Sequence, residues 1–243
     1  MSEKKVRVDK LLANLGYGSR REIALLARYG RIKLSGAALR EADTKITLAD
    51  AAGLTVDGEN IDPLPGVVVM LHKPVGVTCS HKEAGPLVFS ALPDRWRRRE
   101  PALSTVGRLD KDTSGLLLLT DDGALLHRII SPRSEIPKFY RATLARDLSG
   151  DEVEIFASGG LMLEDEEKPL LPARLERLGP REAVVTVTEG RYHQVRRMFA
   201  AVGNHVEALH RQRVGALNLP PDLAPGAWVV LAAGEIEKVF VAT

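Results

Sequence analysis

The sequence predicts an α+β protein in two parts, a small N-terminal α+β domain and a larger domain with a mixed, mostly antiparallel sheet flanked by helices. In the larger part, strand-like stretches form hairpins as often as they alternate with helical stretches, for example on either side of Gly179-Pro180. The segment IDPLPG at 61–66 holds two prolines and a glycine, the composition of a linker. A chain of 243 residues is long enough for two domains of unequal size. We therefore expect domains at 1–60 and 67–243.

Two helices are predicted in the N-terminal domain. The stretch VDKLLANLG (8–16) has apolar residues at helical spacing and ends at a glycine. The stretch SRREIALLARYG (19–30) starts with Ser19 and Glu22 at the spacing of a capping box and ends at Gly30. We expect its buried stripe to consist of four apolar residues, Ile23, Leu25, Leu26 and Tyr29.

Two short strand-like stretches complete this domain. They are RIKLSG (31–36) and LTVDGEN (54–60). The pair Asp57-Gly58 inside the second stretch is typical of a tight turn. The first 60 residues are thus expected to form a compact α+β unit.

Basic residues are concentrated in the first 45 positions. This segment holds eleven Lys and Arg against five Asp and Glu, whereas the net charge of the whole chain is only +2. A basic end on a nearly neutral body indicates a unit that binds a polyanion, and a solvated charged surface is the alternative. The second predicted helix leaves three arginines for its outer face, Arg20, Arg21 and Arg28.

The larger domain is predicted to alternate between strands, turns and helices. A basic loop, RWRRRE, is expected at 95–100. Strands are expected at 67–74, 116–120, 138–146, 173–179, 182–190 and 205–215, and helices at 124–131, 149–160 and 191–203.

The composition excludes several classes of protein. Cys79 is the one cysteine, so an internal disulfide framework and a cysteine-rich zinc site are excluded, and a reducing cytoplasm is expected. The N-terminus lacks the apolar core of a signal peptide, and no apolar run reaches membrane-spanning length. No metal is expected, because three histidines lack partners at metal-ligand spacing: His193, His205 and His210.

The stretch GRLDKDTSGLLLLT (107–120) places charged residues directly before a run of leucines that is expected to be buried. Gly107 and Gly115 bracket this loop, and its short polar side chains can bond to the local backbone. Asp110 is therefore either a reactive carboxylate at a cleft or a residue that pins the loop. Asp110 and Asp112 are too close together for a confident glycosidase pair.

Two further stretches hold candidate site residues. In the strand-like KFYRATL, Tyr140 lies on the same side as Lys138 and can stack on a base, or it is an ordinary half-buried tyrosine. In the helix at 191–203, one face is apolar, and Arg196 lies on its flank, where it can reach a carboxylate in a neighbouring cleft. Arg197 is expected to point away from the core. The residues alone thus predict a basic head and a body with a carboxylate cleft.

These stretches resemble the motifs of a known enzyme family. GRLDKDTSGLLLLTDDG is similar to the aspartate motif of the pseudouridine synthases, KFYRATL to their tyrosine motif and EGRYHQVRRM to their basic motif. The segment 8–60 resembles the small RNA-binding domain shared with ribosomal protein S-four. Within the family, the closest resemblance is to the RsuA type, which acts on small-subunit ribosomal RNA.

The resemblance implies a reaction without cofactor or metal. Asp110 would act on the sugar or the base of a uridine, and Arg196 would keep it ionised and position it through charge-assisted hydrogen bonds. Tyr140 would stack on the base, and Leu209 would pack at the pocket. Arg108 would act as a wedge or phosphate clamp when the uridine leaves its stack. Further RNA contacts are expected from five basic residues, Arg20, Arg21, Arg28, Lys33 and Arg197.

The resemblance thus predicts isomerisation of a specific uridine in ribosomal RNA, with small-subunit RNA as the first choice and large-subunit RNA as the alternative. A non-catalytic RNA-binding or ribosome-assembly factor is the alternative from another class. A binder would not need Asp110 in a basic site, because a carboxylate repels phosphate. The expected partner is ribosomal RNA or a pre-ribosomal particle, and the protein is expected to be a cytoplasmic monomer without membrane contact.

Overall fold

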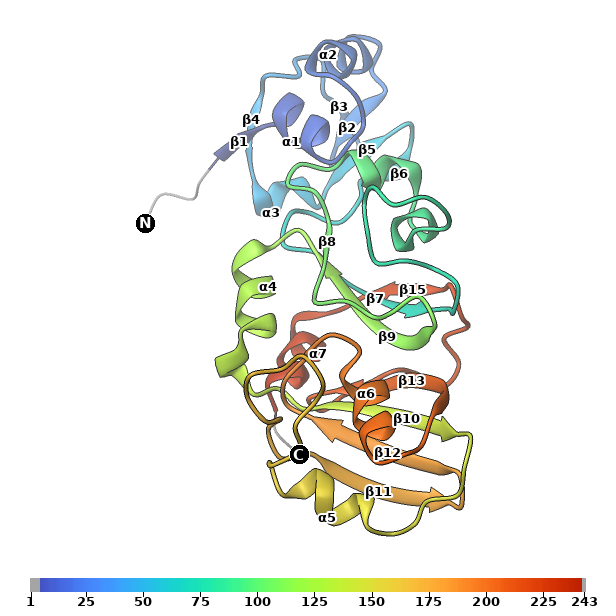
Figure 1. Ribbon diagram of the computed structural model, residues 1–243. Helices are drawn as coiled ribbons and strands as arrows, with labels where there is room; N and C mark the ends of the chain where they lie inside the picture. The colour runs from blue at the N-terminus through green and yellow to red at the C-terminus, as the bar shows by residue number, and fades with distance from the viewer. Residues whose placement is uncertain (1–4, 242–243) are drawn as a thin grey trace. The chain divides into compact units, whose positions relative to one another are not determined.

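The computed structural model describes residues 5–241 and shows two units within them (Figure 1). The first unit comprises residues 5–67 and 92–104, and the second comprises 68–91 and 105–241. The sequence indicated one boundary in 61–66, but the chain returns to the first unit after entering the second.

The described part of the first unit combines three α-helices with small antiparallel sheets. Strands β2, β3, β5 and β6 form one sheet in the order β3-β2-β5-β6, and β1 pairs with β4. The Asp57-Gly58 turn joins β5 to β6 as predicted, with φ angles of 56° and 85°. The elements are β1 (Lys5–Arg7), α1 (Val8–Asn14), α2 (Arg20–Arg28), β2 (Ile32–Leu34), β3 (Ala37–Ala38), β4 (Lys45–Thr47), α3 (Leu48–Ala51), β5 (Leu54–Val56) and β6 (Glu59–Asn60).

Helix α2 has the predicted capping box but a narrower buried face than predicted. Ser19 and Glu22 make both capping bonds. Ile23 and Ala27 are buried, one turn apart on the same face. Leu25 and Tyr29 are 48% and 73% exposed, so their predicted burial is wrong. The reason is geometric: a helix turns about 100° per residue, which places Leu25 far from the Ile23 face.

The segment 92–104 packs onto the first unit through a short 3₁₀ helix, η2 (Asp94–Arg98), where a basic loop was predicted. Its Trp96 is buried. The Arg95 guanidinium pairs with the Asp62 carboxylate at 2.5 Å and lies 4.4 Å from the ring centroid of Tyr17. The Tyr17 hydroxyl in turn accepts from the backbone N–H of Asp62 at 3.0 Å. The predicted linker is therefore held against the first unit by specific contacts.

The second unit is built on one twisted mixed sheet with the strand order β11-β12-β10-β13-β9-β7-β15. Along this order the β13–β9 pair is parallel and the other pairs are antiparallel, which confirms the predicted mixed, mostly antiparallel sheet. Short strands β8 and β14 pair with β9 and β13. The strands are β7 (Val68–Lys73), β8 (Ser104–Thr105), β9 (Thr113–Thr120), β10 (Lys138–Leu144), β11 (Arg174–Gly179), β12 (Glu182–Val187), β13 (Val206–Val214), β14 (Leu217–Asn218) and β15 (Trp228–Val230).

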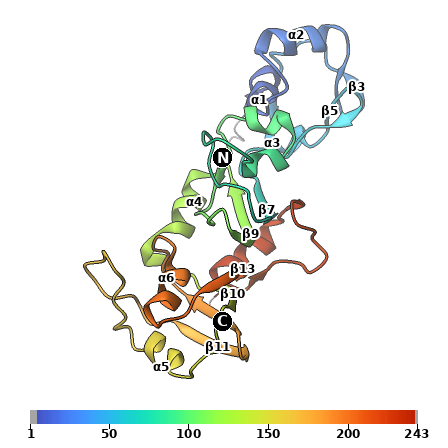
Figure 2. The same ribbon diagram turned by 45° about the vertical axis from the view of Figure 1, so that its right-hand side comes forward.

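Helices flank this sheet, and Figures 1 and 2 show α5 beside β11 and α6 beside β13. The apolar face of α6 is buried as predicted through Val195, Met198 and Phe199. The Phe199 ring meets the edge of Phe156 from α5 at 5.3 Å. The helices and 3₁₀ turns are η1 (Val88–Ala91), α4 (Gly123–Ile130), η3 (Pro132–Ser134), α5 (Glu152–Ala157), α6 (Gln194–Ala201), α7 (Ala233–Glu237) and η4 (Lys238–Phe240).

Between residues 5 and 241, the helices are all too short or too polar to span a bilayer.

Candidate active site

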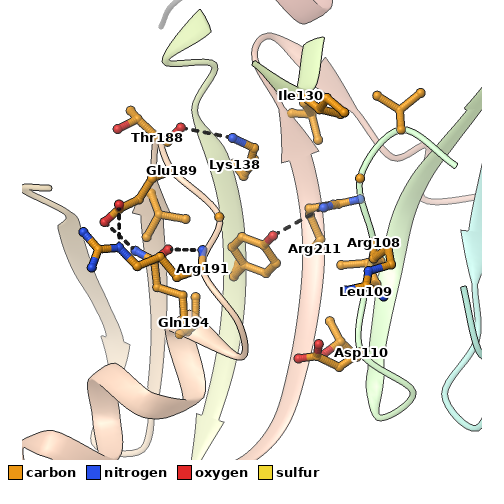
Figure 3. A pocket seen from close by; sticks show the side chains of 18 of the residues that line it. Arg108, Leu109, Asp110, Ile130, Lys138, Thr188, Glu189, Arg191, Gln194 and Arg211 are labelled. Carbon is orange, nitrogen blue, oxygen red and sulfur yellow. Dashed lines mark hydrogen bonds and ion pairs between the residues drawn. The ribbon is translucent and has the colours of Figure 1, made fainter. Parts of the chain in front are cut away.

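A pocket of about 400 Å³ opens in the second unit, where the loop before β9 faces β10, β13 and the loop that leads into α6. Figure 3 shows Arg108, Leu109 and Asp110 on one side of this pocket and Lys138, Thr188 and Glu189 on the other. Three sequence motifs that lie 30 to 90 residues apart along the chain therefore contribute to one cavity.

Asp110 lies on a loop that is held by hydrogen bonds from a buried lysine, Lys73. The Lys73 ammonium donates to the carbonyl oxygens of Pro74, Lys111 and Thr113 at 3.0, 3.2 and 2.8 Å. Its side chain is fully buried, and this burial lowers the pKa of Lys73. The β9 strand that follows is buried over its leucine run. The Asp110 carboxylate, about one third exposed, thus lines the pocket from a loop that is held by Lys73 and followed by a buried strand.

The Asp110 carboxylate lies within ion-pair distance of one basic side chain among residues 5–241, that of His193. Its Nε2 atom lies 3.4 Å from Oδ1 of Asp110, an ion pair when the imidazole is protonated. His193 is the N-cap residue of α6 and has φ = 47°, a left-handed conformation that is uncommon outside glycine. The sequence predicts no role for His193, only that it is not a metal ligand. Its backbone conformation, which local sequence does not reveal, accounts for its position in the pocket wall.

Arg196 does not make the predicted contact with Asp110. Its guanidinium donates to two backbone carbonyl oxygens, those of Val206 at 2.9 Å and Asp112 at 3.0 Å. It therefore binds the aspartate loop through the main chain two residues beyond Asp110. The predicted charge-assisted hydrogen bond from Arg196 to the Asp110 carboxylate is therefore wrong. Arg196 instead holds the loop through the Asp112 carbonyl oxygen.

Tyr140 lies half-buried on β10 in the pocket wall, and its hydroxyl accepts a hydrogen bond from Nη1 of Arg211 at 3.3 Å. Arg211 lies on β13 and is only 5% exposed. Its Nε atom donates to the carbonyl oxygen of Leu116 at 2.8 Å. Sequence analysis did not predict a buried arginine here.

Gly115 explains how Arg211 comes so close to the aspartate strand. These two residues face each other in the parallel β9–β13 pair. Gly115 has φ = 113°, and a Cβ atom there would lie 2.2 Å from the Arg211 carbonyl oxygen. A larger residue would push the strands apart, so Gly115 is required by close backbone approach.

Lys138 is a second, partly buried cation on the pocket wall. Its ammonium donates to the carbonyl oxygens of Ile136 and Thr188 at 3.0 and 3.1 Å. Burial, followed by the charge of Arg211, lowers the pKa of Lys138 to about 8. The Thr188 bond also ties β10 to the segment that leads into α6.

The remaining predicted residues of this unit divide into two groups. Leu209 is buried in the pocket wall and Arg108 is exposed at the pocket, where both were expected. Arg197 is corrected: its guanidinium pairs with the Glu166 carboxylate at 2.9 Å and also donates to the Tyr192 and Glu164 carbonyl oxygens. These bonds engage it within the protein, so it is not a free cation for RNA.

In the first unit, the predicted RNA-contact residues Arg21, Arg28 and Lys33 are exposed. Arg20 is exposed as well, but its guanidinium pairs with the Asp9 carboxylate at 2.8 Å. Asp9 also pairs with Arg7. Desolvation of this buried carboxyl group acts to raise its pKa, but the hydrogen bonds from the two arginines outweigh it, and the pKa of Asp9 is lowered. Arg20 is thus paired with a carboxylate, whereas the other three make no ion pair with the described residues.

Across residues 5–241, no three histidine, cysteine, aspartate or glutamate side chains gather as a metal site would require.

The matches to known proteins cover the same residues. The family model of the RNA pseudouridylate synthases matches residues 67–201. The ribosomal small subunit pseudouridine synthase A of Escherichia coli (strain K12) is 40% identical over 238 residues, which cover 96% of this chain and all of the relative. The chain belongs to the RNA pseudouridylate synthase family. It is therefore an enzyme that converts uridine in RNA to pseudouridine.

Other members support this assignment. The protein of the same name from Yersinia pestis is 39% identical and covers 96% of this chain and 98% of the relative. A crystal structure described as a pseudouridylate synthase shares 35% identity, covers 96% of this chain and 99% of that chain, and superposes with a TM-score of 0.68. The likeness of 8–60 to an S-four-type RNA-binding domain stays a prediction.

Two buried cations near the pocket were not predicted as such: Lys73 had no predicted role, and Arg211 was expected to be an RNA contact or a surface charge. A signal existed for Lys73, which ends the apolar run VVVMLHK and has no charged neighbour in that run to pair with. Arg211 carried no such signal, because HRQR has the composition of an exposed basic segment. Its burial depends on β9, which lies about 95 residues away in sequence.

Proposed function

We propose that this enzyme isomerises one specific uridine of small-subunit ribosomal RNA to pseudouridine, with Asp110, Tyr140 and Arg196 as the central residues. The observation that carries the proposal is the Asp110 carboxylate in a pocket lined mainly by basic side chains. The other carboxylate in the lining, Glu189, pairs with Arg191 at 3.0 Å. In a site that only bound phosphate, the negative charge of Asp110 would lower the affinity. The small-subunit substrate is supported by relatives named for it that align with nearly the whole chain.

The chemistry conserves all atoms of the substrate. Asp110 acts on the ribose or the base, the C1′–N1 bond breaks, and its electron pair stays with the uracil. The detached base turns, C5 bonds to C1′, the C5 proton leaves to a base and N1 takes up a proton. No oxidant, reductant or co-reactant is needed for this balance.

The surrounding residues divide the remaining tasks. Tyr140 stacks on the uracil ring and Leu209 packs against it in the pocket wall. Arg196 positions Asp110 by holding the loop through the Asp112 carbonyl. Arg108, exposed beside Asp110, displaces the target uridine from its stack or clamps its phosphate.

The first unit anchors the RNA in this proposal. Arg21, Arg28 and Lys33 are exposed basic residues that form ion pairs with phosphates. The substrate is free ribosomal RNA or an assembling particle, and the protein works in the cytoplasm as a monomer. Large-subunit RNA as substrate and a non-catalytic assembly role are the two alternatives that the test below separates.

The test maps pseudouridines in both ribosomal RNAs of cells that lack this protein. One small-subunit pseudouridine should disappear, return with the wild-type protein and stay absent with Asp110→Asn. Loss of a large-subunit position would shift the substrate to that RNA. An unchanged pseudouridine map, or full rescue by Asp110→Asn, would overturn the catalytic proposal.

A further inference from the structure

Arg211 is a buried cation without a counter-charge in the described part of the chain. Its guanidinium is bonded to two neutral acceptors, the Leu116 carbonyl and the Tyr140 hydroxyl. Asp110 lines the same pocket, but its carboxylate lies within ion-pair distance of His193. Burying a cation without a paired charge carries a desolvation cost that neutral acceptors offset only in part. This arrangement indicates that an anionic group enters the pocket from outside.

A second cation on the same wall strengthens this conclusion. Lys138 donates only to the carbonyl oxygens of Ile136 and Thr188, and it has no carboxylate within ion-pair distance among residues 5–241. Burial lowers the pKa of Lys138, repulsion from the positive charge of Arg211 lowers it further, and Glu189 acts in the opposite direction. An anion bound in this pocket would relieve that repulsion.

The depth of Arg211 decides which part of an RNA substrate can reach it. Arg108 is exposed at the pocket, whereas Arg211 is 5% exposed and contacts the hydroxyl of Tyr140. The sugar-phosphate backbone of a bound strand stays at the entrance, while the flipped base penetrates furthest. A uracil stacked on Tyr140 would therefore turn its polar edge, with the carbonyl oxygens, toward Arg211.

We propose that Arg211 is a catalytic residue that stabilises the uracil as an anion while the base is detached from the ribose. When the C1′–N1 bond breaks, its electron pair moves onto the uracil and spreads over N1 and the carbonyl oxygens. The Arg211 guanidinium offsets this charge, and Lys138 contributes a second, more distant cation. The charge disappears again when C5 bonds to C1′, the C5 proton leaves and N1 takes up a proton. This inference rests on the proposed function and adds one residue to it.

A double substitution of enzyme and substrate tests the role. Arg211→Gln is compared with the wild type on the target RNA and on the same RNA with 5-fluorouridine at the target position. Fluorine withdraws electrons and stabilises the uracil anion, so the fluorinated base depends less on Arg211. Because fluorine replaces the C5 hydrogen, both assays follow loss of the N-linked nucleoside in a single turnover. The cycle isolates the coupling between Arg211 and the leaving base.

We expect Arg211→Gln to slow the uridine reaction about 100-fold and the 5-fluorouridine reaction about tenfold or less. The first loss is of the size found when one preorganised hydrogen-bond donor to a developing negative charge is removed. Arg211→Lys, which keeps the charge but loses the fork geometry, should recover part of the rate. Arg141→Gln is the matched control, because Arg141 is an exposed arginine next to Tyr140 that pairs with Glu182 outside the pocket. Its rates should equal those of the wild type.

Equal losses on both substrates would overturn the inference and assign Arg211 a structural role. A weaker RNA affinity with unchanged single-turnover rates would overturn it in favour of a phosphate contact. If Arg211→Gln does not fold, Lys138→Gln carries the same test and should show a smaller loss that is again greater for uridine. Failure of the proposed function appears separately, as a wild-type enzyme that modifies no small-subunit uridine.

Discussion

The Nε2 atom of His193 lies 3.4 Å from the Oδ1 atom of Asp110, so the basic motif contacts the aspartate motif through its histidine. Three residues later, Arg196 holds the same loop through the Asp112 carbonyl at 3.0 Å. The start of α6 thus contacts both the side chain and the main chain of the aspartate loop. An aspartate positioned in this way can act on a substrate without first being reoriented.

Replacing His193 by glycine should lower kcat about tenfold with little change in KM, because the carboxylate loses a partner that orients it. Glycine is the informative replacement, since it accepts the left-handed backbone at φ = 47° without strain. The melting temperature should therefore stay level or rise. A fall in both kcat and melting temperature would assign His193 to stability alone, and His193→Gln, which keeps a donor, should retain more activity than the glycine variant.

Arg196→Gln should lower kcat by about 100-fold while RNA affinity changes little, because the loop that carries Asp110 loses its hydrogen bond from α6. Hydrogen exchange of the backbone amides at 107–113 should accelerate in the variant. The matched comparison is Arg197→Gln, which removes the neighbouring arginine and its Glu166 pair but no bond to this loop. Unchanged exchange at 107–113 in Arg196→Gln would contradict the positioning role.

The triple variant Arg21→Gln, Arg28→Gln and Lys33→Gln should bind RNA more weakly and with a shallower salt dependence. Each ion pair with a phosphate releases counterions, so the slope of log K against log salt should fall by about 0.7 to 0.9 for every such ion pair that the variant removes. The control removes a neutralised pair of the same unit, Arg31→Gln with Asp57→Asn, and keeps the net charge. Equal slopes in the triple variant and the wild type would remove the first unit as the RNA anchor.

Lys138 should make stability rise with pH on the alkaline side. Its pKa is about 8 in the folded protein against 10.5 ordinarily, so between these values the unfolded chain binds more protons than the folded one. The wild type therefore gains folding free energy relative to Lys138→Met as pH rises through this window, and below it the difference is constant. Chemical unfolding of both proteins at about pH 7 and about pH 10 measures the change. Parallel stability curves would contradict the lowered pKa.

Local sequence patterns determined the elements and most of the candidate site residues. The leucine run before Thr120 predicts buried β9, the spacing of Ser19 and Glu22 predicts the start of α2, and the aspartate and tyrosine motifs indicate Asp110 and Tyr140. The strand and the helix start depend on local spacing, which a sequence displays directly. For Asp110 and Tyr140 local spacing left two interpretations open, and the resemblance of their motifs to the family decided between them.

Tertiary structure alone decided how the charges pair. In the folded chain Asp110 lies near His193, Arg196 donates to the Asp112 carbonyl oxygen, and Gly115 allows the backbone of Arg211 to approach β9 closely. The segment 92–104 also returns to the first unit. Each of these contacts joins residues about 30 to 100 positions apart, and an arginine has the same local pattern whether its partner is a phosphate, a carboxylate or a carbonyl. The identity of that partner depends on strand pairing and backbone approach, which no local period encodes.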